Sequence, residues 1–328
     1  MKRLGVLVLV LILLAAVYVV VYLGERREEG PSPLFPGYDG AAAASIYIVK
    51  RDGGGERGGE VGGRGRGEGV VLEKKEGVWL VMSEDSLPAD STAVASIVEK
   101  VASFSRNDMV SSNPEKRSLY EVDSLGVLVS IADEAGDTVA AFVVGKMGPD
   151  YQSTYIRDAR SDDVILAAGY IKSMFDRGTR TWQDRVMFRL KSEEITAVGV
   201  ERGSEKYTLS RLPDGRWYVN RPDSAACKQN VVSRMVRAVS FLRCDDFAGR
   251  LPLPESGLAD TDTAMWFGMA TGGEHWLYFG KENEASQVHT LKDDSDIVYL
   301  IARSKINHLL PALDQVLDTE AGPAGAGE

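Results

Sequence analysis

The sequence predicts an α+β protein, in which an N-terminal transmembrane helix precedes two similar tandem domains. Each domain is expected to be a mainly antiparallel sheet with one long and one short helix. Two observations predict this architecture. Leu4 to Leu23 is an unbroken apolar run after a short basic leader. One order of strands and helices also occurs twice, about 135 residues apart, which is the signature of an internal duplication.

The apolar run is long enough to cross a bilayer. About 20 residues of helix span roughly 30 Å, the thickness of the hydrocarbon core. A cleaved signal peptide is the alternative, but its apolar region usually covers about 7–15 residues and ends in small side chains. This run ends in the bulky stretch "VYVVVYLGE". The sequence therefore predicts an uncleaved membrane anchor.

Basic residues flank the run equally, with Lys2 and Arg3 before it and Arg26 and Arg27 after it. The count of cytoplasmic charges is therefore a tie, and the very short leader favours an N-terminus inside. We expect a single-pass protein of the cytoplasmic membrane whose body is extracytoplasmic. The partner implied by Leu4 to Leu23 is the lipid bilayer itself.

Composition divides the chain into five segments. They are an anchor (1–23), a flexible tether rich in Pro, Gly and Ala (24–44), a first α+β repeat (45–185), a second α+β repeat (186–318) and a disordered tail (319–328). Ten of the seventeen residues in 53–69 are glycine, which predicts a disordered loop inside the first repeat. Acidic residues offset the arginines of this loop, and no Gly-Lys-Ser/Thr follows it, so neither RNA binding nor a phosphate-binding loop is favoured.

The long helices provide the clearest sign of duplication. Apolar residues follow the spacing i, i+3, i+4, i+7, i+10 in both, which predicts one buried stripe on each helix. The first stripe is Val94, Ile97, Val98, Val101 and Phe104, and the second is Val232, Met235, Val236, Val239 and Leu242. Every pair is 138 residues apart. Trp79 and Trp217, in "GVWLV" and "GRWYV", keep the same offset and mark the repeats.

The second half of each repeat also matches. "FVVGK", ending at Lys146, corresponds to "LYFGK", ending at Lys281, and "STYIRD" corresponds to "SQVHTL". The Gly-Lys pairs are interpreted as tight strand ends with a solvated lysine. Because each tryptophan keeps a fixed distance from its helix, Trp79 and Trp217 are predicted to pack between strand and helix.

The net charge disfavours a nucleic-acid partner, and the spacing of the two cysteines disfavours a disulfide between them. The net charge of −10 disfavours a nucleic-acid partner, since phosphate binding needs a basic surface. Cys227 and Cys244 lie at the two ends of a predicted helix, about 25 Å apart, whereas a disulfide needs Cα atoms within about 7 Å. They are not expected to form a disulfide with each other.

Reactive and metal-binding motifs are weak. His275, His289 and His308 lack a second ligand at i+3 or i+4 and are interpreted as structural. The acidic runs 162–163 and 293–296 could be carboxylate pairs for acid–base chemistry, but both precede strands and are favoured as turns. No nucleophile motif is present. The sequence therefore predicts no catalytic residue, no metal, no cofactor and no enzymatic activity.

Trp266, Trp276 and Tyr278 are the candidate binding residues. They lie on adjacent predicted strands of the second repeat, where aromatic side chains could line a ligand or partner surface. The alternative is ordinary core packing. Exposure distinguishes the two, because a binding surface must reach solvent.

The motifs together resemble a bacterial domain-of-unknown-function family, DUF4340. The residues that carry the resemblance are "VVLEKKEGVWLV", "AAFVVGK" and "VILAAGYIKSMF" in the first repeat, and "YTLSRLPDGRWYV", "SGLADTD" and "WLYFGK" in the second. The joint "TWQDRVMFRLKSEEITAVGV" is also similar, and the resemblance covers about Ser45 to Leu317. The Gly/Arg loop is an insertion, and "SLYEV" replaces the usual "YGL" of the family, which "SGLAD" matches better.

The resemblance implies a membrane-tethered extracytoplasmic protein associated with ABC-type export or gliding-motility-type auxiliary systems. The leading hypothesis is therefore a non-enzymatic accessory protein of a transport assembly, beside an ABC-2-type permease. Its domains would act as protein-binding or spacer modules. The alternative is a cell-envelope protein that holds a glycan or lipid in the cleft between its domains.

Overall fold

The computed structural model describes residues 15, 18, 32–50, 69–83, 85–220, 225–293 and 295–318. The predicted tail and nearly all of the predicted anchor and Gly/Arg loop lie outside these residues. In the described part, no helix is both long and apolar enough to cross a membrane. The anchor and its orientation therefore remain predictions.

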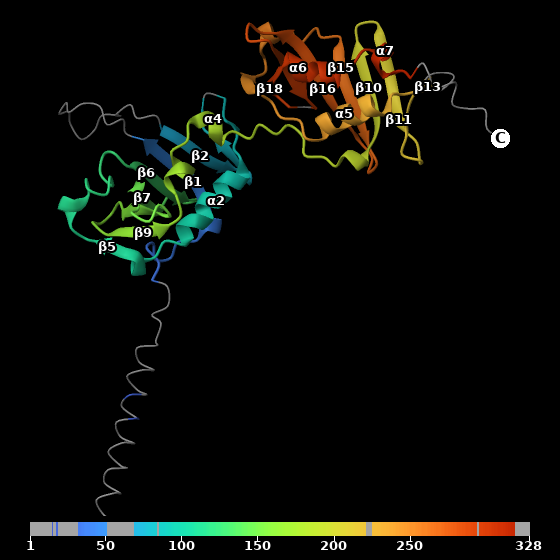
Figure 1. Cartoon of the computed structure of the whole chain (residues 1–328). Helices are drawn as coiled ribbons and strands as arrows, with labels where there is room; N and C mark the ends of the chain where they lie inside the picture. Colours follow the sequence, from blue (N-terminus) through green and yellow to red (C-terminus); the bar gives the residue numbers. More distant parts are fainter. Residues whose placement is uncertain are drawn as a thin grey trace, which may run out of the picture. The chain divides into compact units, whose positions relative to one another are not determined.

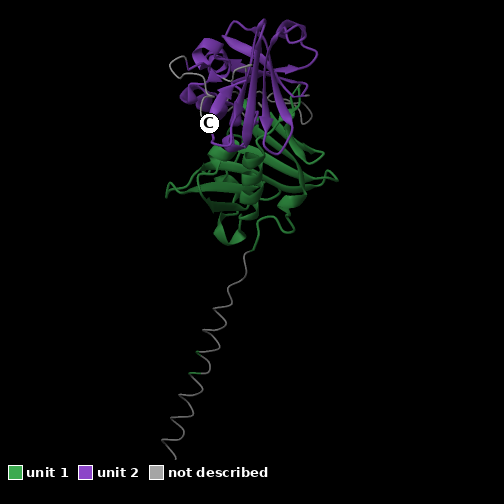
Figure 2. Cartoon of the chain, turned by 90° about the vertical axis from the view of Figure 1, so that its right-hand side faces the viewer, with its two compact units in different colours: residues 1–183 green, residues 184–328 purple. Residues whose placement is uncertain are grey.

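The chain divides into two compact units, residues 1–183 and 184–328 (Figure 2). Each unit is built on a nine-stranded sheet in which every pair of neighbouring strands is antiparallel (Figure 1). The strand order is β4-β3-β2-β1-β6-β7-β8-β9-β5 in the first unit and β13-β12-β11-β10-β15-β16-β17-β18-β14 in the second. When the strands of each unit are numbered from its first strand, the two sheets have the same strand order.

The elements of the first unit are β1 (Ala43–Lys50), β2 (Gly69–Lys75), β3 (Val78–Val81), β4 (Leu87–Pro88), α2 (Ser91–Ala102), β5 (Met109–Ser111), β6 (Val127–Asp133), β7 (Thr138–Met147), β8 (Ser153–Asp158), β9 (Val164–Ala168), α3 (Lys172–Phe175) and α4 (Thr179–Trp182).

The elements of the second unit are β10 (Ile195–Arg202), β11 (Glu205–Arg211), β12 (Trp217–Val219), β13 (Ala225–Ala226), α5 (Gln229–Ser240), β14 (Asp246–Arg250), β15 (Thr263–Met269), β16 (Glu274–Glu282), β17 (Gln287–Lys292), β18 (Ile297–Ala302), α6 (Arg303–Leu309) and α7 (Leu313–Val316).

Two tandem β-rich domains are therefore confirmed. Among the residues that the structure describes, each unit has one long helix, as predicted, but two short α-helices rather than one. The last short helix leads the chain back to the sheet edge in both units. Asp90 N donates to Trp182 O in the first unit, and Lys228 N donates to Val316 O in the second. The duplication thus extends to the closing contact of each unit.

The core of the first unit lies between its sheet and α2. The helix starts at Asp90, whose Oδ1 accepts hydrogen bonds from Thr92 N and Ala93 N at 3.0 and 3.1 Å, an N-cap that satisfies the first free donors. Its apolar stripe packs into one large cluster with alternate residues of the central strands. The buried helix residues are Val94, Ile97 and Val101, as the spacing predicts, and Val98 is partly exposed.

Residues 32–44 belong to the folded first unit, which corrects part of the predicted tether. Leu34 and Phe35 are buried in the core, and Leu34 N donates to Phe104 O at 2.8 Å. The ring of Phe35 lies 5.8 Å from that of Phe142. Proline and glycine prevent long regular elements here, but they do not prevent two large apolar side chains from packing. The remainder of the predicted tether, 24–31, lies outside the described residues.

The Gly-Lys pairs do not end strands, so the sequence-based interpretation of them is wrong. Gly145 lies inside β7 and Gly280 inside β16. A segment of chain crosses the outer face of the sheet at each glycine, and a Cβ built there would overlap the carbonyl oxygen of Tyr120 or Ser256. Glycine is therefore needed at both positions for close backbone approach.

The crossing segments retain another shared feature. Gly257 has φ +67° in the second unit, and Glu121 has φ +55° at the corresponding position of the first. The backbone conformation has therefore been kept although the glycine has been replaced. This explains how "SLYEV" can stand where the family usually has "YGL".

Both thiols are free and buried, in agreement with the expectation that Cys227 and Cys244 do not pair. Burial raises the pKa of Cys227 to about 11 and that of Cys244 to about 12. Both are therefore protonated and poorly nucleophilic near neutral pH.

Candidate functional site

The three candidate aromatic residues form one cluster on the second unit. Trp266 on β15 pairs directly with Trp276 on β16, and their ring centroids are 6.2 Å apart. Tyr278, two residues further along β16, stacks on Trp276 at 5.9 Å with an interplanar angle of 12°. All three side chains are partly exposed. We call this set the aromatic cluster.

The aromatic cluster lies on the sheet face opposite the buried core. Side chains alternate between the two faces of a strand, and the buried neighbours are Met265, Phe267, Leu277 and Phe279. Core packing of the three aromatics, the alternative at the sequence level, therefore does not describe their position.

Gly199 supports the cluster, and its role was not predicted from the sequence. This residue of β10 pairs with Trp266, and a Cβ built on it would overlap the indole ring. The ring therefore lies flat across a glycine of the neighbouring strand. A glycine in the interior of a strand rich in β-branched residues, "ITAVGVER", is the signal that could have indicated such a close approach.

The first unit has no such cluster at the corresponding positions. When Gly145 is placed on Gly280, strand register assigns Ser130 to Trp266, Ala141 to Trp276 and Val143 to Tyr278. By the same register, the residue of the first unit that corresponds to Gly199 is Tyr47, which is 47% exposed. The shared fold therefore does not require aromatic residues at these three sites.

The two repeat markers differ in burial. Trp217 is only 4% exposed, and Gln229 holds its backbone on both sides: Gln229 Oε1 accepts from Trp217 N at 2.9 Å and Gln229 Nε2 donates to Trp217 O at 2.8 Å. Trp79 packs against the core of the first unit but remains partly exposed in a hollow beside α2. The predicted position between strand and helix thus describes Trp217 more fully than Trp79.

The histidines have local structural partners. His275 Nδ1 lies 3.1 Å from Asp293 Oδ2, His289 Nδ1 lies 2.8 Å from Lys281 O, and His308 Nδ1 lies 2.7 Å from Ser304 O. His275 also packs against Phe188 and Phe267 at 5.3 and 5.4 Å. None of these contacts joins one histidine to another.

The acidic runs lie in turns and ion pairs. Asp162 pairs with Arg117, and Asp163 pairs with Arg106. In the second run, Asp293 Oδ1 accepts from Trp276 N at 2.8 Å, and Asp296 pairs with Arg250. Asp294 lies outside the described residues. In the part of the chain that the structure describes, no group of three or more His, Cys, Asp and Glu residues is placed to hold a metal ion.

Comparison with known proteins places the chain in a family. The family described as "Domain of unknown function (DUF4340)" matches residues 79–262, more than half of the chain. The match begins at Trp79 in the first unit and ends just before β15 in the second, so it includes the joint between them. The protein belongs to the DUF4340 family. No curated protein and no solved structure matches the chain.

Proposed function

We propose that this protein is a non-enzymatic, membrane-anchored extracytoplasmic accessory protein of a transport assembly, beside an ABC-2-type permease. In this proposal the first unit is mainly a spacer and the second unit binds the partner. The sequence-predicted anchor and the properties implied by the family resemblance support the membrane setting. The aromatic cluster supports the assignment of binding to the second unit.

The observation that carries the proposal is the difference between equivalent sheet faces. In the first unit, Ser130 and Ala141 stand at the positions of Trp266 and Trp276, so the shared fold does not need the two tryptophans. The counterpart of Tyr278 is Val143, which is buried in a small cluster on that face. A group of large, partly exposed aromatic side chains can mark an interaction surface, and Trp and Tyr are among the side chains that most often dominate protein–protein interfaces.

A second candidate function is the binding of a glycan, and the stacking of Trp276 on Tyr278 favours it. Flat, partly exposed rings offer apolar faces against which a sugar ring can pack. The sequence-based hypothesis places the ligand in a cleft between the domains. The aromatic cluster lies on the sheet of one unit, so a glycan would bind to that face, and the interdomain cleft remains a prediction.

The test is purification of the full chain from membranes in a mild detergent, followed by identification of stoichiometric partners. We expect a polytopic permease and its ATPase to co-purify with the wild type. The double variant Trp276→Ala/Tyr278→Ala should lower the amount of recovered partner at least about tenfold, since truncating a hot-spot residue weakens binding by about 2 kcal/mol or more.

The matched control is Tyr47→Ala, which removes an exposed aromatic from the outer face of the first unit. It should leave partner recovery unchanged. Recovery of the wild type as a monomer without a permease would contradict the proposal. Binding of a purified envelope glycan that the Trp276→Ala/Tyr278→Ala variant abolishes, in the absence of any protein partner, would favour the second candidate instead.

A further inference from the structure

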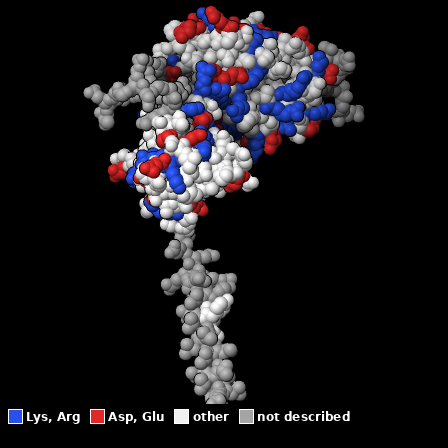
Figure 3. Space-filling model, turned by 60° about the vertical axis from the view of Figure 1, so that its left-hand side comes forward, with Lys and Arg blue, Asp and Glu red and all other residues white. Residues whose placement is uncertain are grey.

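The helices α5 and α6 of the second unit form a strongly basic surface in an acidic protein. Neither helix contains Asp or Glu, although the chain has a net charge of −10. The basic helix face consists of Lys228, Arg234, Arg237, Arg243 and Lys305, all of which are exposed. Figure 3 shows Lys and Arg gathered on one side of the second unit, with fewer acidic residues among them.

The charges of this face are largely unpaired. Among the described residues, Lys228, Arg234, Arg237 and Arg243 form no ion pair, and Arg234 and Arg237 donate only to carbonyl oxygens of their own helix. Lys305 pairs with Asp245 at 2.7 Å. Four cations thus remain available to an external anion.

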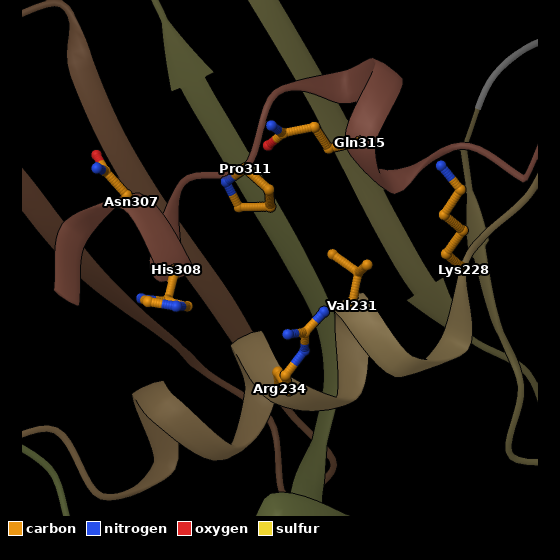
Figure 4. A pocket seen from close by; sticks show the side chains of 7 residues that line it. All are labelled: Lys228, Val231, Arg234, Asn307, His308, Pro311 and Gln315. Carbon is orange, nitrogen blue, oxygen red and sulfur yellow. The ribbon is translucent and has the colours of Figure 1, made fainter. Parts of the chain in front are cut away.

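Two shallow hollows connect the helices across this face. The first, of about 410 Å³, is lined by Arg234 from α5 and His308 from α6, with Lys228 at one side (Figure 4). The second hollow is lined by Phe241, Arg243, Lys305 and again His308. Because His308 lines both hollows, they belong to one continuous surface.

An exposed aromatic residue stands at the end of the basic helix face. Phe241, which directly follows α5, is 55% exposed. Its ring lies beside Arg243 and Lys305 in the second hollow. An apolar side chain surrounded by cations is typical of surfaces that bind at the interface of an anionic bilayer, where the ring enters the headgroup region and the cations meet phosphates.

The first unit again provides the comparison. At the helix offset of 138 residues, the positions of Lys228, Arg234, Arg237, Phe241 and Arg243 are occupied by Asp90, Ser96, Glu99, Ser103 and Ser105. Each of these four cations and the exposed ring therefore corresponds to an acidic or small polar residue in the first unit. The fold does not require either feature, so their joint presence on α5 needs another explanation.

We propose that the basic helix face and Phe241 dock the second unit onto the surface of an anionic phospholipid bilayer. The occupant is the membrane rather than a single soluble anion, because the cations are spread along two helices and the hollows between them are shallow. Docking is a separate property from partner binding by the aromatic cluster, although the predicted anchor would raise the local concentration of bilayer around the unit.

The test uses the full chain reconstituted into vesicles of phosphatidylcholine alone, or with about one third phosphatidylglycerol. An environment-sensitive fluorophore is attached at Ser304→Cys on α6, which is exposed, while buried Cys227 and Cys244 react slowly. We expect a blue shift and a rise in emission only in the anionic vesicles. A second label at Thr271→Cys, in the exposed turn between β15 and β16, should not respond.

Two variants probe the chemistry. Arg234→Gln/Arg237→Gln should lower the docking equilibrium constant by about 30-fold, because each Lys or Arg near an anionic surface raises that constant by about fivefold. Phe241→Ser should weaken docking, but the docking that remains should still depend on the anionic lipid. The matched control is Lys206→Gln/Lys281→Gln, which removes the same charge from strands β11 and β16 and should leave docking unchanged.

Equal emission in neutral and anionic vesicles, or an unchanged response in Arg234→Gln/Arg237→Gln, would overturn the proposal. So would protection of the Ser304 label by a co-purified protein without any response to anionic lipid, which would assign the face to a protein partner. Extraction of the chain by alkaline carbonate tests the anchor separately. A chain that is extracted but still responds to anionic lipid would contradict the anchor and retain the docking face.

Discussion

The two units bury equivalent residues and expose different ones. In both, the long helix buries an apolar stripe. A glycine, Gly145 in β7 or Gly280 in β16, lets a chain segment cross the sheet closely, and the last helix returns the chain to the sheet edge. Outside the core, small and acidic side chains of the first unit are replaced by aromatic and basic ones in the second. The features shared by the copies therefore report on folding, and the features confined to one copy are the ones on which the binding proposals rest.

The largest expected difference concerns the repeat tryptophans. Trp217→Ala should destabilise the second unit by about 3–5 kcal/mol, because it empties a buried indole site. Trp79→Ala should cost the first unit only about 1–3 kcal/mol, because part of the ring is already in water. Denaturant unfolding of the full chain, followed by circular dichroism and fluorescence, measures both. Equal costs would show that the two tryptophans have the same role.

Gln229→Ala provides the control for the second unit. It keeps the indole but removes the side chain that bonds to Trp217 N and O. A cost well below that of Trp217→Ala would attribute the larger loss to the buried ring rather than to its hydrogen-bonded backbone.

The glycines under the chain crossings should behave alike in both units. Gly145→Ala and Gly280→Ala each introduce a methyl group against a backbone carbonyl, and overpacking of this kind costs about 1–3 kcal/mol. The control is Gly178→Ala, because a methyl group there would meet open space and the φ of Gly178 is negative. Gly136 is not used as a control, because its φ of +85° would add backbone strain. A loss of stability in Gly145→Ala without a similar loss in Gly280→Ala would show that the two chain crossings are not structurally equivalent.

Sequence patterns predicted the parts of the fold that repeat at fixed spacing. The stripes of α2 and α5 and the markers Trp79 and Trp217 keep one offset, because an insertion inside a packed helix–strand unit would displace buried residues. Edge strands such as β5 and β14 were missed, since they are short and only partly buried, and their sequences lack clear alternation.

The candidate site was only partly predictable for a related reason. Trp266, Trp276 and Tyr278 were recognisable as aromatics on neighbouring strands, but their face depends on register, which sequence alone does not fix. Gly199 is far from Trp266 in sequence and adjacent to it across the sheet. The basic helix face needs α5 and α6 together, and their packing depends on how the chain returns after β18.

A smaller difference is expected where the copies keep a left-handed backbone with different residues. Gly257→Ala should destabilise the second unit by about 1–2 kcal/mol, because a Cβ is unfavourable at φ +67°. Glu121→Gly should change the first unit by less than about 1 kcal/mol, since relief of that strain is offset by greater freedom of the unfolded chain. Thermal unfolding of the two variants compares them, and a costly Glu121→Gly would point to a specific role of the Glu121 side chain.

The last expected difference is in alkaline stability. Burial raises the pKa of Cys227 to about 11 and of Cys244 to about 12, from the value of 9.0 for a solvent-exposed thiol. The unfolded state therefore loses these protons first, so their contribution to stability is present below about pH 9 and is lost as pH rises toward 11–12. In the first unit, Tyr38 has a pKa raised to about 12 from 10.0, so the corresponding loss begins about one pH unit higher.

Denaturant midpoints measured between about pH 8 and 11 should fall first for the transition that Trp217→Ala assigns to the second unit. Lys292 opposes this trend, because burial lowers its pKa and the folded state releases its proton earlier. Lys292→Met removes that opposition and should steepen the fall. The variant Cys227→Ala/Cys244→Ala should instead shift the onset in the second unit upward, toward that of the first. An unchanged onset would mean that the thiols do not set the alkaline limit of the second unit.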